Sequence, residues 1–367
     1  MQRTQASLAL IKGRASADAT RTLRKQFAKS RPENFYRPLA NGVVVSSLGL
    51  GTYLGDCDDE EDARYTIAAG AALARGINLL DTSINYRCQR SERALGAAIQ
   101  KSVNSGKIRR DQIVVCSKGG YIPLDRNPPA TKDEYHRFLE EEYFLRGVMD
   151  PVDVIAGGHC LSGQFLEDQV ERSRRNLGLE TIDVYYLHNP EQALDVLSRQ
   201  RFLTVVRDAF VVLERAVENG FIGCYGCATW NGFRVPPESR NHLSLEELVS
   251  LAHEAGGAGH HFSVIQLPIN LAMTEAVRTE TQSVGRDRVT PLEAAHRLGI
   301  SVIASATLMQ SQLTRGLPEQ VHAAFPGFST DARRAIAFTQ SLPLSAALVG
   351  MKSLAHLEEN LAAPNLS

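Results

Sequence analysis

The sequence predicts an α/β fold, a (β/α)8 TIM barrel of parallel strands, on three observations. Short apolar runs alternate along the chain with amphipathic helical stretches. These runs are apolar at nearly every position, as in parallel strands that are covered on both faces. Eight of them occur, which is the number of strands that closes a barrel. A doubly wound sheet is the alternative, but no G-x-G-x-x-G follows the first run.

The elements follow in order from this alternation. The predicted strands span residues 43–51, 77–83, 112–117, 152–158, 182–188, 222–228, 261–270 and 300–308. The predicted helices between them span residues 60–75, 91–102, 166–177, 202–219, 245–255 and 290–298. Gly178 directly after one of these helices is a typical C-terminal stop.

Three segments are longer than the usual loop of a β/α unit: residues 120–151, 229–243 and 309–330. Because loops that follow barrel strands cover the C-terminal face, we expect these long loops to shape a substrate pocket there. The first contains an aromatic and acidic stretch, residues 135–145, which can contact substrate or serve as a packed lid or interface.

The N-terminus differs in charge from the rest of the chain. Residues 1–32 carry eight Lys or Arg and one acid, whereas the 367-residue chain has a formal net charge of -1. We therefore separate a basic N-terminal extension, residues 1–34, from a single domain, residues 35–367. The extension can be an organelle targeting segment, but a cytoplasmic protein is the expectation. The net charge gives no drive towards nucleic acid, and no apolar run is long enough for a membrane span.

The six cysteines show no spacing typical of a disulfide framework, which fits a reducing compartment. Cys224 and Cys227 form a C-x-x-C, which can be a redox motif or half of a zinc site. No second cysteine pair completes a metal set, so we expect core packing and no metal.

Four polar residues lie at or just after the ends of three consecutive predicted strands: Asp81 and Tyr86 at the second, Lys118 at the third and His159 at the fourth. A barrel collects such residues at one rim. A tyrosine phenol has a pKa of about 10, and a nearby ammonium lowers it so that the proton leaves more easily. Asp81 would hold Lys118, and His159 could hydrogen-bond a carbonyl oxygen. The set predicts proton-donating carbonyl reduction.

The chain resembles the aldo-keto reductase superfamily over residues 36–363. The segments that carry the resemblance are residues 35–51, 76–96, 173–190 and 350–360. The resemblance implies an N-terminal β-hairpin, a catalytic tetrad of Asp81, Tyr86, Lys118 and His159, and hydride from a nicotinamide cofactor held without a Rossmann fold. The cofactor-binding residues it implies are Gly51, Thr52, Thr229, Gln266, Ser305, Gly350, Lys352, Ser353, His356 and Asn360. Candidate substrate-pocket residues are Tyr53, Asn189 and Trp230.

This chain differs from the family pattern at two places, and two of its residues imply a preference between cofactors. Where the family usually has a Ser-Asn pair, this chain has Ala228-Thr229. Where many members have a Tyr that stacks on the nicotinamide ring, this chain has Ser305. Lys352 and Ser353 could pair with a 2′-phosphate, which implies NADPH, with NADH as the alternative. The leading hypothesis is NAD(P)H-dependent reduction of a small aldehyde or ketone, with Tyr86 as proton donor. The alternative, motivated by the departures, is a cofactor-binding regulatory or sensor subunit with little catalysis.

Overall fold

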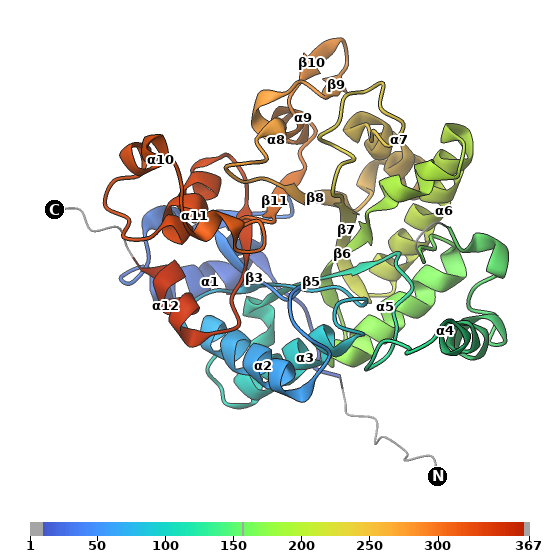
Figure 1. Ribbon diagram of the computed structural model, residues 1–367, viewed down its shortest axis with the longest axis horizontal. Coiled ribbons are helices and arrows are strands. Elements are labelled where there is room, and N and C mark those ends of the chain that lie inside the picture. Colours follow the sequence, from blue (N-terminus) through green and yellow to red (C-terminus); the bar gives the residue numbers. More distant parts are fainter. Residues whose placement is uncertain (1–9, 156–157, 363–367) are drawn as a thin grey trace.

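A computed structural model describes residues 10–155 and 158–362. Its centre is a closed barrel of eight parallel strands, with helices around the outside (Figure 1). In order around the ring the strands are β11 (Ser301–Ser305), β12 (Ala346–Gly350), β3 (Leu48–Gly51), β4 (Leu79–Asp81), β5 (Val114–Gly119), β6 (Ile182–His188), β7 (Ile222–Ala228) and β8 (Phe262–Pro268). The predicted α/β barrel is confirmed.

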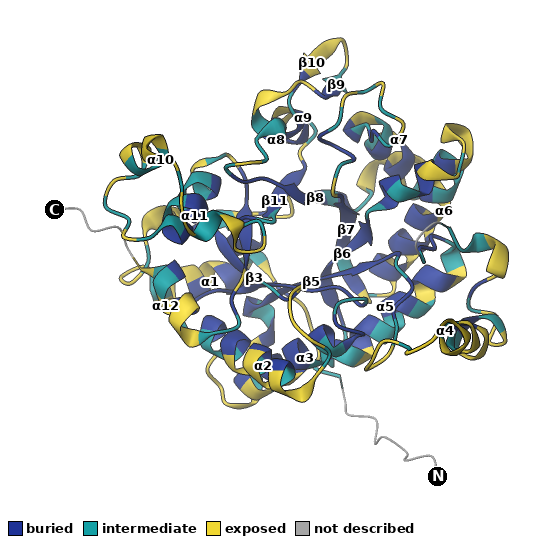
Figure 2. Cartoon of the chain, viewed as in Figure 1, coloured by how far each residue is buried: buried dark blue, intermediate teal, exposed yellow. Residues whose placement is uncertain are grey.

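The barrel forms because almost every residue of its strands is buried, on the inner or the outer face (Figure 2). Side chains of alternate residues fill the interior, among them Leu79, Val114 and Ile303. The residues between them pack outwards against the helices. Cys224 belongs to the inner cluster and Cys227 to the outer one, so the two thiols of the C-x-x-C lie on opposite faces of β7. Both pack as core residues.

One predicted strand is wrong, and one barrel strand was not predicted. Residues 151–153 form a 3-10 turn, Val152 is 86% exposed, and residues 156–157 lie outside the described residues. The strand beside β5 is β6, and the described part of this run, residues 152–155 and 158, contributes no barrel strand. The eighth strand is β12, whose alanines gave only a weak strand pattern. The remaining seven predicted runs each overlap a barrel strand.

The six predicted helices are present, and several begin at a side-chain cap. Asp58 accepts a hydrogen bond from the Glu61 amide at the start of α2, and Ser198 caps α6 in the same way. The helices are α1 (Ala17–Phe27), α2 (Asp59–Ala74), α3 (Arg90–Asn104), α4 (Lys132–Leu139), α5 (Gly163–Leu177), α6 (Arg199–Glu218), α7 (Leu245–Gly256), α8 (Glu275–Arg278), α9 (Pro291–Arg297), α10 (Glu319–Ala324), α11 (Asp331–Ser341) and α12 (Leu354–Leu361). Within the described part of the chain, none has the length and apolar character of a membrane span.

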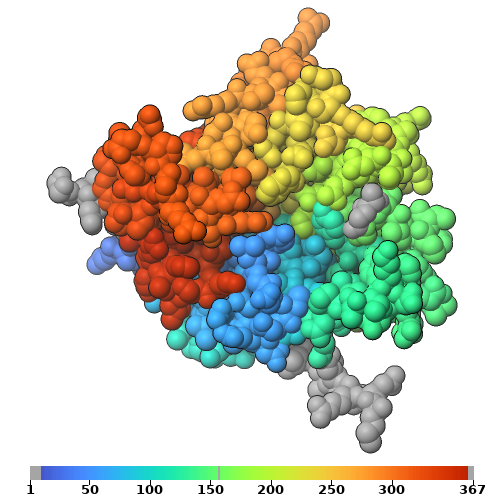
Figure 3. Space-filling view, viewed as in Figure 1, coloured from blue at the N-terminus to red at the C-terminus, as the bar shows by residue number. Residues whose placement is uncertain are grey.

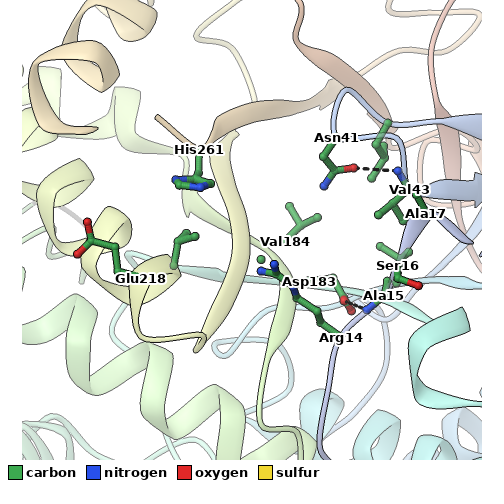
Figure 4. Close-up of a pocket in the computed structure, with 14 residues that line it drawn as sticks. Arg14, Ala15, Ser16, Ala17, Asn41, Val43, Asp183, Val184, Glu218 and His261 are labelled. Atoms are coloured by element: carbon green, nitrogen blue, oxygen red, sulfur yellow. Dashed lines mark hydrogen bonds between the residues drawn. The ribbon is translucent and has the colours of Figure 1, made fainter. Parts of the chain in front are cut away.

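The N-terminal end of the barrel is covered by a hairpin and by α1. Strands β1 (Tyr36–Pro38) and β2 (Val44–Ser46) pair antiparallel, as the resemblance implied. The amide of Ala15, just before α1, donates to Oδ1 of Asp183 at 2.6 Å, which ties this segment to β6. A cavity of about 540 Å³ lies between the N-terminal segment, the hairpin and the starts of the strands (Figure 4).

The long loops at the other end contain structure of their own. The loop after β5 holds α4 and a π-helical turn, Glu140–Phe144, which pack over a separate small core. Tyr143 in that turn is fully buried, and its hydroxyl donates to the Pro123 carbonyl. A short hairpin, β9 (Gln282–Val284) with β10 (Asp287–Val289), projects after α8 (Figure 1).

Candidate active site

A cavity of about 550 Å³ opens among the loops that follow the barrel strands. Eleven residues predicted from the sequence line it: Gly51, Thr52, Tyr53, Asp81, Tyr86, Asn189, Thr229, Trp230, Gln266, Ser305 and Gly350. They come from segments separated by up to about 300 residues, and the closed ring of strands brings them together. This is the end at which barrels of this kind gather reactive groups.

Lys118 and Asp81 form a buried ion pair beneath the cavity. The Lys118 ammonium donates to Oδ1 of Asp81 at 2.6 Å and to the Thr82 carbonyl at 2.8 Å, and its side chain has no exposed surface. Burial is the largest influence and lowers the pKa of Lys118, but the Asp81 carboxylate, together with Tyr86 and Cys116, leaves the pKa above its usual value. The ammonium therefore stays charged although it is out of contact with water.

Tyr86 lies between this ion pair and the cavity. Nζ of Lys118 is 4.9 Å from the centroid of the Tyr86 ring. Burial raises the pKa of Tyr86, and the positive charge of Lys118 offsets part of this rise. The phenol is therefore protonated at neutral pH, next to a cation that favours its anion. A group in this position can give up a proton to a bound acceptor.

The histidine in the cavity wall is His188, the last residue of β6. Its Nδ1 lies 3.2 Å from the Ser83 hydroxyl, and its ring packs edge-on against Tyr86 with centroids 5.7 Å apart. Burial, followed by the charge of Lys118, lowers the pKa of His188 well below its usual value, so the ring is neutral. The sequence prediction missed His188, although it ends a predicted strand.

His159, the predicted member of the tetrad, lies behind His188 and outside the lining of the cavity. Its Nε2 donates to the carbonyl oxygen of His188 at 2.7 Å. Burial lowers the pKa of His159 to about 4, and its Nδ1 is buried with no hydrogen-bond partner. His159 thus contacts the backbone of the cavity histidine. The physical reason for the error is that the barrel strand beside β5 is β6, which ends at His188.

One wall of the cavity carries polar groups that could hold an amide. Nε2 of Gln266 donates to Oδ2 of Asp81 at 2.8 Å, and its carbonyl oxygen remains as an acceptor group. The hydroxyls of Thr229 and Thr307 are buried without a hydrogen-bond partner and belong to residues that line the cavity. Because buried hydroxyls normally have partners, these two fit a polar ligand such as a carboxamide. Ser305 lies beside them and offers no aromatic face.

The predicted residues beyond Gly350 lie outside the cavity lining. Nζ of Lys352 donates to Oε2 of the buried Glu61 at 2.8 Å, which ties the C-terminal segment to α2; their segments adjoin in Figure 3. Ser353 caps α12 by accepting a hydrogen bond from the amide of His356, whose side chain is exposed. Asn360 is buried in α12. Lys352, two residues after Gly350, is thus already paired.

Aromatic side chains surround the mouth of the cavity. Tyr53 is 58% exposed and packs edge-on against Tyr86, and Trp230 is 44% exposed across the opening. Nδ2 of Asn189 donates to the hydroxyl of Tyr121 at 3.0 Å. Tyr121 lines the cavity and was not singled out from the sequence, although it follows the strand that carries Lys118.

Comparison with known proteins gives one consistent result. The model of the Aldo/keto reductase family matches residues 47–322. A D-threo-aldose 1-dehydrogenase from Pseudomonas sp is 28% identical over 195 residues, covering 51% of each chain. An NADH-specific methylglyoxal reductase from Escherichia coli (strain K12) is 25% identical over 214 residues, covering 56% of this chain and 54% of the relative. The chain thus spans about half the length of the curated relatives it matches.

The solved structures that resemble this chain share its fold. An aldo/keto reductase from Klebsiella pneumoniae in complex with NADP and acetate superposes with a TM-score of 0.58 at 17% identity, covering 89% of this chain and 88% of that one. A thermostable aldo-keto reductase in complex with the inhibitor epalrestat gives the same TM-score and identity, covering 92% of that chain.

Proposed function

The chain belongs to the aldo/keto reductase family, and from this premise we propose that it is an oxidoreductase that reduces the carbonyl group of a small aldehyde or ketone to an alcohol. The observation that carries the proposal is the arrangement of Tyr86 over the buried Lys118–Asp81 ion pair at the floor of the cavity. Among the described residues that line the cavity, no other protonated donor lies beside a charge that would stabilise its conjugate base.

We propose Tyr86 as the proton donor to the carbonyl oxygen. As negative charge develops on the phenol, the Lys118 ammonium stabilises it, and Asp81 keeps that ammonium charged and in place. When Nδ1 of His188 accepts a hydrogen bond from Ser83, its Nε2–H can donate to the same carbonyl oxygen. The proposed catalytic residues are therefore Asp81, Tyr86, Lys118 and His188, with His159 as a positioning residue behind His188.

A nicotinamide cofactor would supply the hydride that adds to the carbonyl carbon. Gln266, Thr229 and Thr307 would bind its carboxamide, since they provide an acceptor and two hydroxyls without partners at one wall. The rest of the cofactor would extend from that wall to the opening of the cavity, along Gly51, Thr52, Ser305 and Gly350. The Klebsiella pneumoniae protein of the same fold is in complex with NADP, which supports this class of cofactor.

We propose that the preference for NADPH over NADH is small. Lys352 is the candidate for a 2′-phosphate, but it can bind one only after its ion pair with Glu61 opens. Ser353 and the exposed His356 could complete such a site. The carboxylate of Glu61 would also repel a phosphate, whereas it can accept a hydrogen bond from a ribose hydroxyl.

We propose a small carbonyl compound with an apolar or aromatic portion as the substrate. Tyr53, Tyr121 and Trp230 would contact it at the mouth, and Asn189 could hydrogen-bond a hydroxyl group of a sugar-like substrate. The relatives are described as acting on an aldose and on methylglyoxal, both carbonyl compounds. The lining residues include no arginine or lysine, which disfavours polyanionic substrates.

The Tyr86→Phe variant tests the proposal. It removes the donated proton but keeps the ring, so turnover should fall about 10²–10⁴-fold while affinity for the cofactor stays within about twofold. Steady-state turnover on a panel of aldehydes, with fluorescence titration of NADPH and NADH, gives both quantities. Turnover close to that of the unmodified protein would overturn the mechanism. If the unmodified protein binds cofactor but reduces no member of the panel, the alternative of a cofactor-binding regulatory subunit is favoured, in line with Ala228 and Ser305.

A further inference from the structure

Two cysteine thiols face each other between the first two loops at the cavity end of the barrel. Cys57 lies between β3 and α2, and Cys88 lies between β4 and α3, two residues after Tyr86. Their sulfur atoms are 3.6 Å apart. A disulfide bond is about 2.05 Å long, so the sulfurs must approach by about 1.5 Å, through side-chain rotation together with a shift of the two loops.

Arg87 holds the two cysteines opposite each other. Its Nε donates to the carbonyl of Asp56 at 2.7 Å, and its Nη2 donates to the carbonyl of Asp58 at 3.2 Å. These carbonyls flank Cys57 on both sides, while Arg87 itself precedes Cys88. A second contact comes from the Arg126 amide, which donates to the Cys88 carbonyl at 3.0 Å. The pair is therefore held in place by hydrogen bonds that do not involve sulfur, which raises the effective concentration of one thiol at the other.

The two thiols differ in the way that a stepwise oxidation requires. Cys57 is the one cysteine of the six that keeps partial exposure to solvent, whereas Cys88 is buried. Burial and the neighbouring Cys57 raise the pKa of the Cys88 thiol to about 12, so Cys88 is a poor first nucleophile. The exposed thiol would react first with a small oxidant, and the buried thiol would resolve the product.

We propose that Cys57 and Cys88 are a peroxide-reactive dithiol that forms a reversible intramolecular disulfide between the two loops beside the cavity. The Cys57 thiolate attacks one oxygen of a hydroperoxide, the O–O bond breaks, and the sulfur becomes a sulfenic acid as hydroxide or alkoxide leaves. The Cys88 sulfur then attacks the sulfenic sulfur, the S–S bond forms, and water leaves once the Cys88 proton is transferred. The two thiols lose two electrons, and the hydroperoxide gains them. A dithiol such as dithiothreitol reverses the change by thiol–disulfide exchange.

The disulfide would restrict both loops that flank the proposed catalytic tyrosine. Thr52, Tyr53 and Leu54 of the first loop line the cavity. In the second loop, Arg87, Cys88 and Gln89 have φ angles of 49°, 53° and 66°, a left-handed conformation that costs free energy in residues other than glycine. A backbone already in this conformation has little freedom to absorb a shift, so closure of the S–S distance should displace Tyr86. We expect turnover to fall by roughly tenfold or more, because displacements of about 1 Å can cost more than that.

Peptide mapping tests the cross-link directly. The purified full chain is treated with hydrogen peroxide, alkylated, digested without reductant and analysed by mass spectrometry. We expect one peptide pair that links Cys57 to Cys88, lost after dithiothreitol. Cys57→Ser and Cys88→Ser should each abolish it, whereas the control Cys160→Ser, a buried thiol in another cluster, should retain it. A sulfinic or sulfonic acid at Cys57 without the cross-link, or no oxidation at Cys57, would overturn the proposal.

A second measurement tests the effect on the cavity. Turnover of the oxidised protein should fall and should recover with dithiothreitol. Peroxide should leave the turnover of Cys88→Ser, which cannot form the disulfide, largely unchanged before any reduction. This arm rests on the proposed reductase function, whereas the cross-link does not, so the two can fail separately. A cross-link that forms without any change in turnover or cofactor affinity would contradict the proposal that the disulfide restricts the two loops beside the cavity.

Discussion

The two ends of the barrel use the same components in different ways. Each end has a cavity, of about 550 Å³ at the mouth and about 540 Å³ at the N-terminal end, and each has a buried ion pair beside its cavity. At the mouth Lys118 pairs with Asp81 at 2.6 Å. At the other end Arg110 pairs with Asp183 at 2.8 Å, and Asp183 also lines the cavity (Figure 4).

The two buried ion pairs differ in the groups that they contact. Asp183 accepts from the backbone amides of Ala15 and Val115, and Arg110 donates to two backbone carbonyls, so that pair joins chain segments to one another. The Lys118–Asp81 pair instead contacts side chains that face the cavity, Tyr86 and Gln266. A buried charge pair is therefore evidence of a reactive site only when its neighbours are groups that a ligand can reach.

The largest expected effect comes from Lys118→Met, which breaks the mouth pair. Loss of the ammonium leaves Asp81 buried without a counter-ion and removes the charge that favours the Tyr86 phenolate. We expect turnover to fall about 10²–10⁴-fold in the fraction that folds. Steady-state kinetics measures turnover, on protein whose circular dichroism matches that of the unmodified protein. Turnover within about tenfold of the unmodified protein would contradict the proposed difference between the two ion pairs.

Arg110→Met is the matched change at the other end. It leaves Asp183 buried without its partner, so we expect the free energy of unfolding to fall by about 3–5 kcal/mol while turnover of folded protein is unchanged. Urea unfolding and kinetics together measure both quantities. Arg109→Met, which breaks an exposed ion pair with Asp111, is the control and should change stability by less than about 1 kcal/mol. A large loss of turnover in Arg110→Met would contradict this assignment.

The buried His159 should also make the stability of the molecule depend on pH. The pKa of His159 is about 4 in the folded protein, below its ordinary value, because burial disfavours its charged form. Between these pH values the unfolded chain binds a proton that the folded chain does not, so stability falls as pH drops from about 6.5 to about 4. We expect the loss of unfolding free energy over this pH range to be about 3 kcal/mol smaller in His159→Gln. Unfolding curves measured across that range, with the exposed His356→Gln as control, test it; parallel curves for His159→Gln and the unmodified protein would contradict it.

The smallest effect concerns the cofactor. Glu61→Gln removes the partner of Lys352, so the ratio of NADPH to NADH affinity should rise about two- to fivefold. Fluorescence titration measures it, and Glu60→Gln, an exposed neighbour paired with Arg64, should leave the ratio unchanged. An unchanged ratio in Glu61→Gln would place the 2′ position of the ribose away from Lys352.

Most of the barrel could be predicted from the sequence because its strands are covered on both faces, which leaves continuous apolar runs. The run at 152–158 has the same composition, but composition does not reveal whether a partner strand is available, and β5 pairs with β6 instead. Because a strand was predicted there, the histidine that follows it, His159, was predicted as the catalytic one. His188 ends the strand next to that of Lys118, so a correct strand count would have found it.

The parts of the site that depend on pairing between distant side chains could not be predicted. The ion pair of Lys352 with Glu61 joins residues 291 positions apart, and nothing in either local pattern indicates the other. The same holds for the bond of Gln266 with Asp81 and for the hydroxyls of Thr229 and Thr307 without partners. Such contacts arise from closure of the ring.

The hydrogen bond from Gln266 to Asp81 joins β8 to β4 across the barrel, between residues 185 positions apart in the chain. The proposed proton donor, its cation and the cavity histidine all come from the first four barrel strands in the chain and the loops after them, but the second oxygen of Asp81 is held from β8. Two fragments cut between β6 and β7 would thus each lack part of the reaction centre. Recovery of turnover on mixing them would report the assembly of the complete ring.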